Sequence, residues 1–200
     1  MRKLPKMKIH YYGHSCFLIE VKGKKLLFDP FIAGNPLAKD IDIQEIKPDY
    51  IFLSHGHGDH IGDAIAIGLS SNAAVIGTFE VVSWLENQGL RGYHMNTGGK
   101  RNFDFGTVKM VNAIHSSMLP DGTYGANPAG FVVYDTEYCF YFAGDTALTL
   151  DMKLIPMMCP PLEFAILPIG DNFTMGYEDA VLAAEFLQCD KIIGCHFDSF

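Results

Sequence analysis

Few features of this 200-residue chain point to a membrane, a secretion route or a nucleic acid. No apolar run approaches the ~20 residues that cross a bilayer. The basic start of the chain leads into an alternating strand pattern instead of the apolar segment of a signal peptide. Lysine and arginine number 15 against 23 aspartates and glutamates, a net charge of −8 that disfavours binding to phosphate backbones. We therefore expect neither a membrane nor a nucleic-acid partner.

Cysteine is also scarce, and its pattern excludes a disulfide framework. The five cysteines form an odd set without a CxxC pair and lie mostly in apolar segments, which favours reduced thiols in the core: Cys16, Cys139, Cys159, Cys189 and Cys195. Reduced thiols favour a cytoplasmic location. Nearly half of the residues (48%) are apolar and no linker or repeat interrupts them, so we expect one globular domain over residues 1–200.

Short apolar runs alternate with helix-like segments along the chain. The first part reads as hairpin strands and both halves contain strand–helix alternation, which suits two packed sheets with helices outside, a four-layer α/β arrangement. The pattern predicts strands at 7–12, 15–21, 24–28, 50–53, 73–77, 107–113, 130–134, 138–142, 164–167 and 191–195. It predicts helices at 61–69, 79–87, 148–155 and 177–187, with a hairpin or loop at 92–106.

The most informative segment follows the predicted strand at 50–53 and reads Ser-His-Gly-His-Gly-Asp-His. Imidazole nitrogen and carboxylate oxygen are ligands that zinc and similar divalent metals prefer. His55 and His57 are spaced to hold one ion, and Asp59 and His60 lie on the far side of the turn for a second. The intervening glycines remove side chains that would block this convergence. A solvated histidine-rich loop is the alternative, but such tracts usually lack this spacing.

Three further polar residues come directly after predicted strands, where ligands collect in α/β sheets. His115 completes a set with His55 and His57, and His196 completes a set with Asp59 and His60. Asp145 is placed to bridge the two ions, and capping of a following helix is its alternative role. Such a set leaves a position open for solvent, as catalytic metal sites do.

Other candidates carry two readings each. Asp29 ends a strand, so it either accepts the second ring N–H of a ligand histidine or is a turn residue before Pro30. His14 either lines the pocket or is a hydrogen-bonded strand histidine. For His10 and His94 we expect ordinary hydrogen bonding.

Together these residues resemble the metallo-β-lactamase superfamily. Its HxHxDH signature matches the segment from His55 to His60, and its later ligands match His115, Asp145 and His196 in order and context. The segments at 13–17 and 168–175, with the pair at 196–197, are similar to its small, largely uncharacterised metal-dependent hydrolases. That branch resembles the ascorbate-phosphate lactonases.

The resemblance implies an αββα sandwich with a dinuclear site at one edge. It also implies hydrolysis by a metal-activated water, with Asp59 orienting the water or relaying a proton. The cofactors would be two divalent ions, zinc first, although the same donors accept manganese, iron or nickel. Relatives usually continue after the position of His196, whereas four residues follow here, so this end is either shortened or unusual.

The expected partner is a small-molecule substrate, and no sequence signal indicates an oligomeric state. The resemblance favours a lactone or other ester. A phosphodiester is the alternative because two metals suit in-line displacement at phosphorus, and a glutathione thioester is a third. A di-iron redox or sensor protein is the alternative of another class. His14, Asn172 and Thr174 are the candidate substrate-binding residues, each against a purely structural role.

Overall fold

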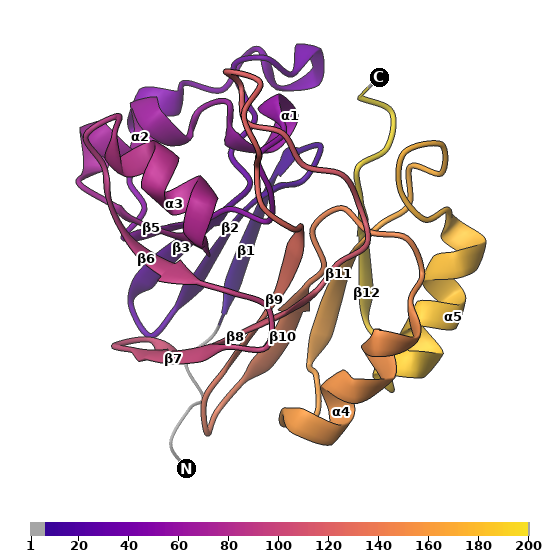
Figure 1. The fold of residues 1–200 in the computed structure, drawn as a ribbon. Coiled ribbons are helices and arrows are strands. Elements are labelled where there is room, and N and C mark those ends of the chain that lie inside the picture. The colour runs from indigo at the N-terminus through magenta and orange to yellow at the C-terminus, as the bar shows by residue number, and fades with distance from the viewer. Residues whose placement is uncertain (1–6, 200) are drawn as a thin grey trace.

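Two six-stranded sheets pack face to face in the computed structural model, which describes residues 7–199. Helices cover the outer face of each sheet, so the layers run helix, sheet, sheet, helix (Figure 1). The four-layer αββα sandwich predicted from the sequence is therefore confirmed.

The first sheet comes from the N-terminal half of the chain, in the order β1-β2-β3-β4-β5-β6. β1 to β3 are antiparallel to one another, whereas β3 to β6 run parallel. Parallel strands bring their carboxyl ends to one edge, and the loops after them meet there. The strands are β1 (Lys8–Gly13), β2 (Cys16–Val21), β3 (Lys24–Phe28), β4 (Tyr50–Phe52), β5 (Ala74–Thr78) and β6 (Arg91–Met95).

The second sheet comes from the C-terminal half, in the order β12-β11-β10-β9-β8-β7. β7 to β10 form an antiparallel meander, and β11 and β12 extend it in parallel with β10. The strands are β7 (Lys100–Phe103), β8 (Gly106–Asn112), β9 (Ala129–Tyr134), β10 (Cys139–Phe142), β11 (Phe164–Pro168) and β12 (Ile192–Cys195).

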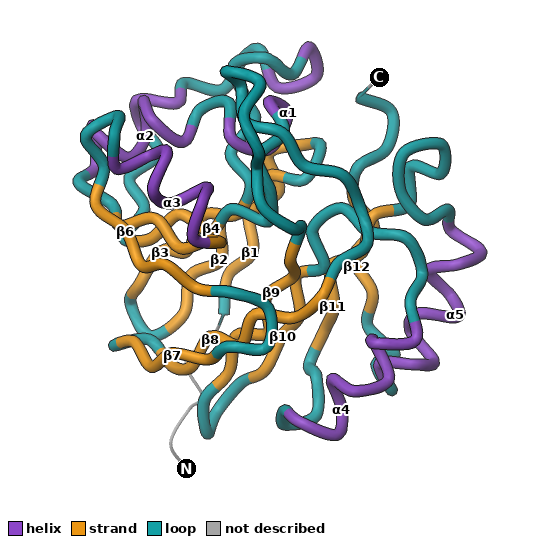
Figure 2. Tube along the Cα trace, in the orientation of Figure 1, coloured by secondary structure: helices purple, strands orange, loops and turns teal. Residues whose placement is uncertain are grey.

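The helices are short and amphipathic, because each needs one apolar face only. On the first sheet lie 3₁₀ turns η1 (Pro36–Ala38) and η2 (Ile43–Glu45) and helices α1 (Gly58–Ile61), α2 (Ala64–Ser71) and α3 (Phe79–Glu86). On the second lie η3 (Leu150–Leu154), α4 (Ile155–Met158) and α5 (Tyr177–Leu187). The tube in Figure 2 shows the loops gathered at the end of the sandwich where α1 and the C-terminus lie.

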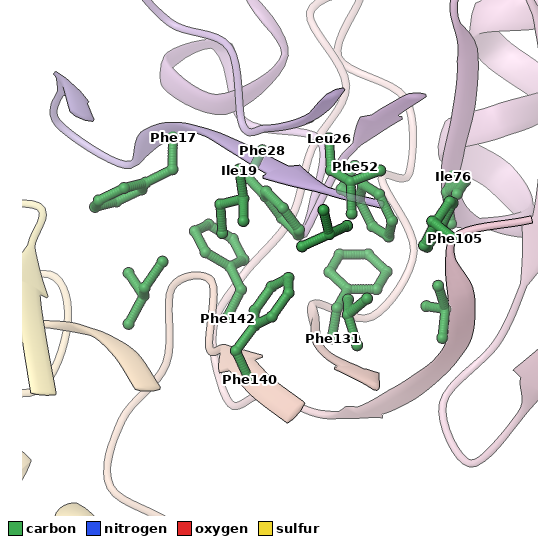
Figure 3. Packing of buried hydrophobic residues seen from close by; sticks show 14 of the residues in the cluster. Phe17, Ile19, Leu26, Phe28, Phe52, Ile76, Phe105, Phe131, Phe140 and Phe142 are labelled. Carbon is green, nitrogen blue, oxygen red and sulfur yellow. The ribbon is translucent and has the colours of Figure 1, made fainter. Parts of the chain in front are cut away.

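The core between the sheets is aromatic (Figure 3). Phe28 stacks on Phe52 from the neighbouring strand, with ring centroids 4.5 Å apart, and Phe142 from the second sheet lies 4.9 Å from Phe28. All three are fully buried. Burying one such side chain contributes about 1.5–3 kcal/mol, so this layer holds the two sheets in a fixed relative position.

Alternation along the strands fills the outer layers too. In β2, Phe17 and Ile19 face the shared core, whereas Cys16 and Leu18 face the helices. Successive side chains of a strand point to opposite faces of its sheet. One face of each sheet packs on the other sheet, so the opposite face needs a layer of helices to bury it. All five cysteines are free thiols, and Cys159 is the least buried of them.

Three predicted elements differ from the structure. The helix expected at 61–69 is divided into α1 and α2, because Asp63 between them accepts hydrogen bonds from Ile32 N (2.6 Å) and Ala33 N (2.9 Å). The helix expected at 148–155 is mostly 3₁₀, and Pro156 starts a separate turn because it lacks an N–H. The 92–106 segment contributes the edge strands β6 and β7, whose polar residues resemble those of a loop.

Among residues 7–199, no helix is both long enough and apolar enough to cross a membrane.

Candidate metal centre

The histidine loop leaves the carboxyl end of β4 and enters α1. His55 is fully buried, and His57 is half-buried at the position before the first helical turn. The short helix then turns Asp59 and His60 back over the loop. His60 N and Ile61 N both donate to the His57 carbonyl, at 3.0 Å each, which closes this turn.

The two loop glycines differ in the space around them, and Gly56 is the more tightly packed. A Cβ on Gly56 would lie 3.2 Å from the Met118 carbonyl, and its N–H donates to Ser117 Oγ at 3.0 Å, so the loop packs tightly on the 117–125 segment. A Cβ on Gly58 would meet nothing within 4 Å. The expectation that both glycines permit close convergence is thus wrong for Gly58.

The second sheet supplies three further polar residues at strand ends. His115 follows β8, Asp145 follows β10 and His196 follows β12 directly. Asp145 and His196 are buried, with exposed fractions of 1% and 6%. Gly144 has a φ of +63°, and a Cβ there would lie 2.5 Å from Ser54 Cβ, so only glycine brings Asp145 this close to the histidine loop.

Two groups of donor atoms result. In the first, one ring nitrogen each from His55, His57 and His115 lies within 4.8 Å of the others, and His55 Nε2 is 2.9 Å from His57 Nδ1. In the second, Asp59, His60 and His196 meet within the same limit. The Oδ2 atom of Asp59 is 3.5 Å from His60 Nε2 and 3.7 Å from His196 Nε2.

Asp145 lies between the groups. Its Oδ2 atom is 3.0 Å from His196 Nε2 and 3.2 Å from His60 Nε2 in the second group, and 3.6 Å from His115 Nε2 in the first. One carboxylate therefore contacts imidazoles of both groups, as a bridging ligand would. The structure thus brings together all seven residues that the sequence nominated.

Asp29 supports the groups from behind. It is fully buried, and its Oδ2 atom lies 2.7 Å from His60 Nδ1. It also accepts hydrogen bonds from Ser54 N at 2.8 Å and from Ser54 Oγ at 2.6 Å. Of the two roles considered from the sequence, the geometry matches that of a carboxylate that orients a histidine.

These supporting bonds determine which ring nitrogens carry lone pairs. Ser54 has one hydroxyl proton and donates it to Asp29, so it accepts from His55 Nδ1, 2.9 Å away, and His55 Nε2 is an acceptor. His60 Nδ1 likewise donates to Asp29, which leaves the lone pair of Nε2 directed at the Asp145 carboxylate. In the neutral ring two acceptors then face each other, and either a proton on Nε2 or a bound cation must lie between them.

Buried atoms without hydrogen bonds support the same conclusion. Within residues 7–199, His60 Nε2 and Asp145 Oδ1 are buried and make no hydrogen bond of acceptable geometry. Such atoms are costly unless another partner satisfies them. Imidazole and carboxylate donors that converge in this way fit divalent metal ions.

The pKa shifts indicate the same preference for positive charge. Burial opposes protonation of His60, but the Asp145 and Asp29 carboxylates raise its pKa well above the usual range. His196 is similar: burial opposes protonation, and Asp145 and Asp59 raise its pKa to about 9. By contrast, burial lowers the pKa of His55, which is therefore neutral, the form that binds metals.

The two carboxylates respond in the opposite direction. Burial opposes ionisation of Asp59 and Asp145. The nearby imidazoles of His14, His196 and His60 nevertheless hold the pKa of Asp59 well below its usual range, and the charge of His60 does the same for Asp145. Both carboxylates are therefore ionised and available to a cation.

A cavity of about 620 Å³ opens over the two groups. Apart from candidate ligands, its walls include the side chains of Phe31 and Phe173. Within residues 7–199, no lysine or arginine lines it. Of the described residues, those that line the cavity are Phe31, His57, Gly58, Asp59, His115, Ser116, Asp145, Phe173 and His196.

The predicted substrate-binding residues lie elsewhere. Asn172 and Thr174 are not among the lining residues, and Thr174 Oγ1 donates to the Met175 carbonyl at 3.1 Å. Phe173 between them lines the cavity instead, at the tip of a tight turn that the hydrogen bond from Thr174 N to the Asp171 carbonyl closes at 2.9 Å. His14 is buried beneath Asp59, with Nε2 3.0 Å from Asp59 Oδ2.

Sequence reasoning missed several contributors. Ser54 gave a signal, since it precedes the first histidine directly, but its link to Asp29 spans 25 positions and is visible only in the fold. Phe31 and Phe173 gave no signal, because the sequence alone does not distinguish an aromatic residue that lines a cavity from one in the core.

The sequence matches a known protein family over almost its whole length. A family model described as a Beta-lactamase superfamily domain matches residues 8–196. A UPF0173 metal-dependent hydrolase from Flavobacterium johnsoniae is 55% identical over 194 residues, covering 97% of this chain and 86% of that protein. A second from Methylacidiphilum infernorum is 51% identical over 195 residues, with the same coverage of 97% and 86%.

Solved structures show the same fold. Igni18, a metallo hydrolase from the archaeon Ignicoccus hospitalis, superposes with a TM-score of 0.87 at 33% identity, covering 97% of this chain and 84% of that one. An isothiocyanate hydrolase from Delia radicum gut bacteria has a TM-score of 0.75 at 20% identity, covering 96% and 85%. The latter likeness concerns the fold alone.

The fold, the donor groups and these matches define the class of protein as a metal-dependent hydrolase. The chain belongs to the β-lactamase superfamily and, within it, to the UPF0173 metal-dependent hydrolases.

Proposed function

We propose that the protein is a dinuclear metal-dependent hydrolase of neutral esters, lactones among them. His55, His57 and His115 would hold one ion, Asp59, His60 and His196 the other, and Asp145 would contact both. Zinc is the first candidate for both positions, and manganese, iron and nickel accept the same donors. The observation that carries the substrate class is the cavity, which combines these donors with aromatic walls and has no lysine or arginine among its described lining.

Bound divalent ions lower the pKa of water from about 15.7 towards 7 and polarise a carbonyl oxygen. Asp59 is suited to assist, because its side chain is 24% exposed and lines the cavity, while its Oδ2 atom is held against His60 and His196. Its carboxylate would orient the attacking water and accept a proton from it. The walls of the cavity would exclude bulk water from the reacting carbonyl.

The chemistry of the cavity walls separates the candidate substrates. Phe31 and Phe173 offer apolar contact to an acyl or alkyl group. A glutathione thioester carries carboxylates remote from the scissile bond, and a site for it would be expected to present arginine or lysine to them. Two metal ions can hold the anionic oxygens of a phosphodiester, so the walls favour an ester over it only through the apolar contact that Phe31 and Phe173 offer. The side chains of the cavity therefore favour a neutral ester.

A redox function of a di-iron centre is the alternative of another class. Hydrolysis is favoured because the donor set leaves room for solvent and substrate in the same cavity. Iron remains one of the metals to be tested.

The test is a substrate screen on protein reconstituted separately with zinc, manganese and iron. It compares aryl esters and lactones with a phosphodiester and a glutathione thioester at equal concentration. The proposal expects kcat/KM to be highest for the neutral esters and to require added metal. Preferred turnover of the phosphodiester or thioester would overturn the substrate class, and coloured, redox-active protein without esterase activity would overturn the hydrolase mechanism.

A further inference from the structure

His14 lies in the tight turn between β1 and β2, next to the second donor group. Its side chain is fully buried, and Nε2 is 3.0 Å from Asp59 Oδ2. One ring nitrogen of His14 lies within 4.8 Å of the ligand atoms of Asp59, His60 and His196, so four donors converge where the proposed function requires three. The function proposed above gives this histidine no role.

The hydrogen bonds of Ser199 determine the tautomer of His14. Ser199 Oγ donates its only proton to the Phe197 carbonyl at 3.0 Å. It therefore accepts the bond from His14 Nδ1, which is 2.9 Å away. With the ring proton on Nδ1, Nε2 carries a lone pair, and this lone pair faces an ionised carboxylate oxygen.

Two acceptors at 3.0 Å repel each other unless a second ring proton or a metal cation lies between them, and burial lowers the pKa of His14, which disfavours the second proton. The same relation holds between His60 Nε2 and Asp145 Oδ2, where Asp29 keeps the ring proton on the opposite nitrogen. His14 and His60 thus share one design: a hydrogen bond on Nδ1 and a lone pair directed into the donor group. That is the usual arrangement of a metal-ligating histidine.

The main chain fixes His14 relative to the group. Its carbonyl accepts from His196 N and from Tyr11 Oη, each at 2.9 Å, so the β1–β2 turn is bonded directly to the strand end that carries His196. The two imidazole rings lie 4.1 Å apart. Movement of His14 away from the group would require these bonds to break.

We propose that His14 Nε2 is an additional ligand of the ion held by Asp59, His60 and His196. The inference rests on the proposed dinuclear site and extends it: each ion would then have three imidazoles. The second ion would consequently be bound about as firmly as the first, and the protein would hold both without excess metal in solution.

The competing role is positional, in which His14 donates a hydrogen bond to Asp59 and binds no metal. His14→Gln separates the two roles, because a glutamine amide still donates to Asp59 but is a poor zinc ligand. His14→Ala removes both functions. His10→Gln is the matched control, since His10 is an exposed residue of β1 whose Nε2 lies 3.6 Å from Glu20.

The experiment titrates each metal-free protein with zinc against a chromophoric chelator and records the two dissociation constants. Cobalt-substituted samples are also examined by proton NMR for hyperfine-shifted, exchangeable ring N–H signals. We expect His14→Gln and His14→Ala to keep one tight ion and to bind the second more than 100-fold more weakly, beyond the roughly 10–100-fold cost of losing a supporting bond. One shifted N–H signal should disappear in both variants.

Two results would overturn the inference. In one, both variants bind two ions as tightly as the His10→Gln control. In the other, His14→Gln behaves as the control while only His14→Ala weakens, which assigns a positional role. If the unaltered protein binds fewer than two ions, the dinuclear site itself fails, and this outcome is distinct because it appears before any substitution. Circular dichroism of each variant verifies that the fold is kept.

Discussion

The Asp29 carboxylate lies 2.7 Å from Nδ1 of His60, and both side chains are fully buried. The same carboxylate accepts from the Ser54 hydroxyl, which in turn accepts from His55 Nδ1. One buried carboxylate therefore orients two imidazoles, one from each donor group. A change at Asp29 should therefore alter the metal affinity of both donor groups.

Asp29→Asn should weaken zinc binding by roughly 10- to 100-fold, because the amide is a poorer acceptor for the His60 ring proton. Asparagine tolerates the positive φ of this position (+40°), so the fold should persist. Ser54→Ala is the comparison variant. It leaves the hydrogen bond that His60 Nδ1 donates to Asp29 in place, and it should weaken metal binding chiefly at the group that contains His55. Chelator competition measures both, and an unchanged zinc affinity in Asp29→Asn would contradict the supporting role.

His57→Ala and Asp145→Ala should abolish turnover while the fold is largely kept, since each removes a proposed ligand from the edge of the sandwich. His57→Ala should lose one ion, whereas Asp145→Ala should weaken both because Asp145 contacts both groups. Metal analysis and ester hydrolysis check these outcomes together. Full metal content with full activity in either variant would reject that residue as a ligand.

Phe173→Ala should raise KM for an aryl ester roughly tenfold with a smaller change in kcat, because it removes about 1.4 kcal/mol of apolar contact. The side chain is 66% exposed, so its loss should cost little stability. Asn172→Ala, at the neighbouring exposed position outside the cavity, is the matched control. Equal kinetics in the two variants would remove Phe173 from the substrate contacts.

Gly144→Ala should reduce metal affinity, because the new methyl group would lie 2.5 Å from Ser54 Cβ at a φ of +63°. Relief of that contact displaces either Asp145 or the histidine loop. Gly58→Ala is the control, since a Cβ there has no atom within 4 Å. We expect unchanged zinc binding in Gly58→Ala, and the steric argument fails if the two variants are equal.

Phe52→Ala should lower the free energy of unfolding by about 3–5 kcal/mol, as expected for an aromatic side chain removed from a closed core. Phe52 contacts Phe28 in its own sheet and Phe131 in the other. Phe79→Ala, at a side chain that is 58% exposed, should cost less than about 1 kcal/mol. Urea denaturation of the metal-loaded proteins provides the measurement, and similar midpoints would show that the aromatic layer matters less than its burial indicates.

The sequence predicted the architecture and the donor residues because both depend on local signals. Two-residue alternation identified the strands, and a polar residue after a strand marked His115, Asp145 and His196. Helix boundaries were less predictable. Asp63 lies between α1 and α2 and accepts a hydrogen bond from Ile32 N in the loop after β3, a contact between residues 31 positions apart.

The remaining features of the site depend on distant contacts. His14 and Asp59 are 45 positions apart, and His14 and Ser199 are 185 apart, so no spacing rule connects them. The direction of Phe173 depends on the tight turn that carries it, closed by the bond from Thr174 N to the Asp171 carbonyl. The sequence offered Asn172 and Thr174 as the residues of this turn that contact substrate. Sequence thus identified the chemistry of the site, and the fold determined its substrate-facing wall.

Each donor group draws on both sheets of the sandwich. His55, His57, Asp59 and His60 follow β4 of the first sheet, whereas His115, Asp145 and His196 follow strands of the second. A bound ion would therefore cross-link the two halves of the chain at this edge, in addition to the backbone hydrogen bonds from His196 N to the His14 carbonyl and from Ala129 N to the Ser54 carbonyl. Separation of the sheets at this edge and release of metal would then be one event, so metal supply would set how long the protein resists unfolding and proteolysis.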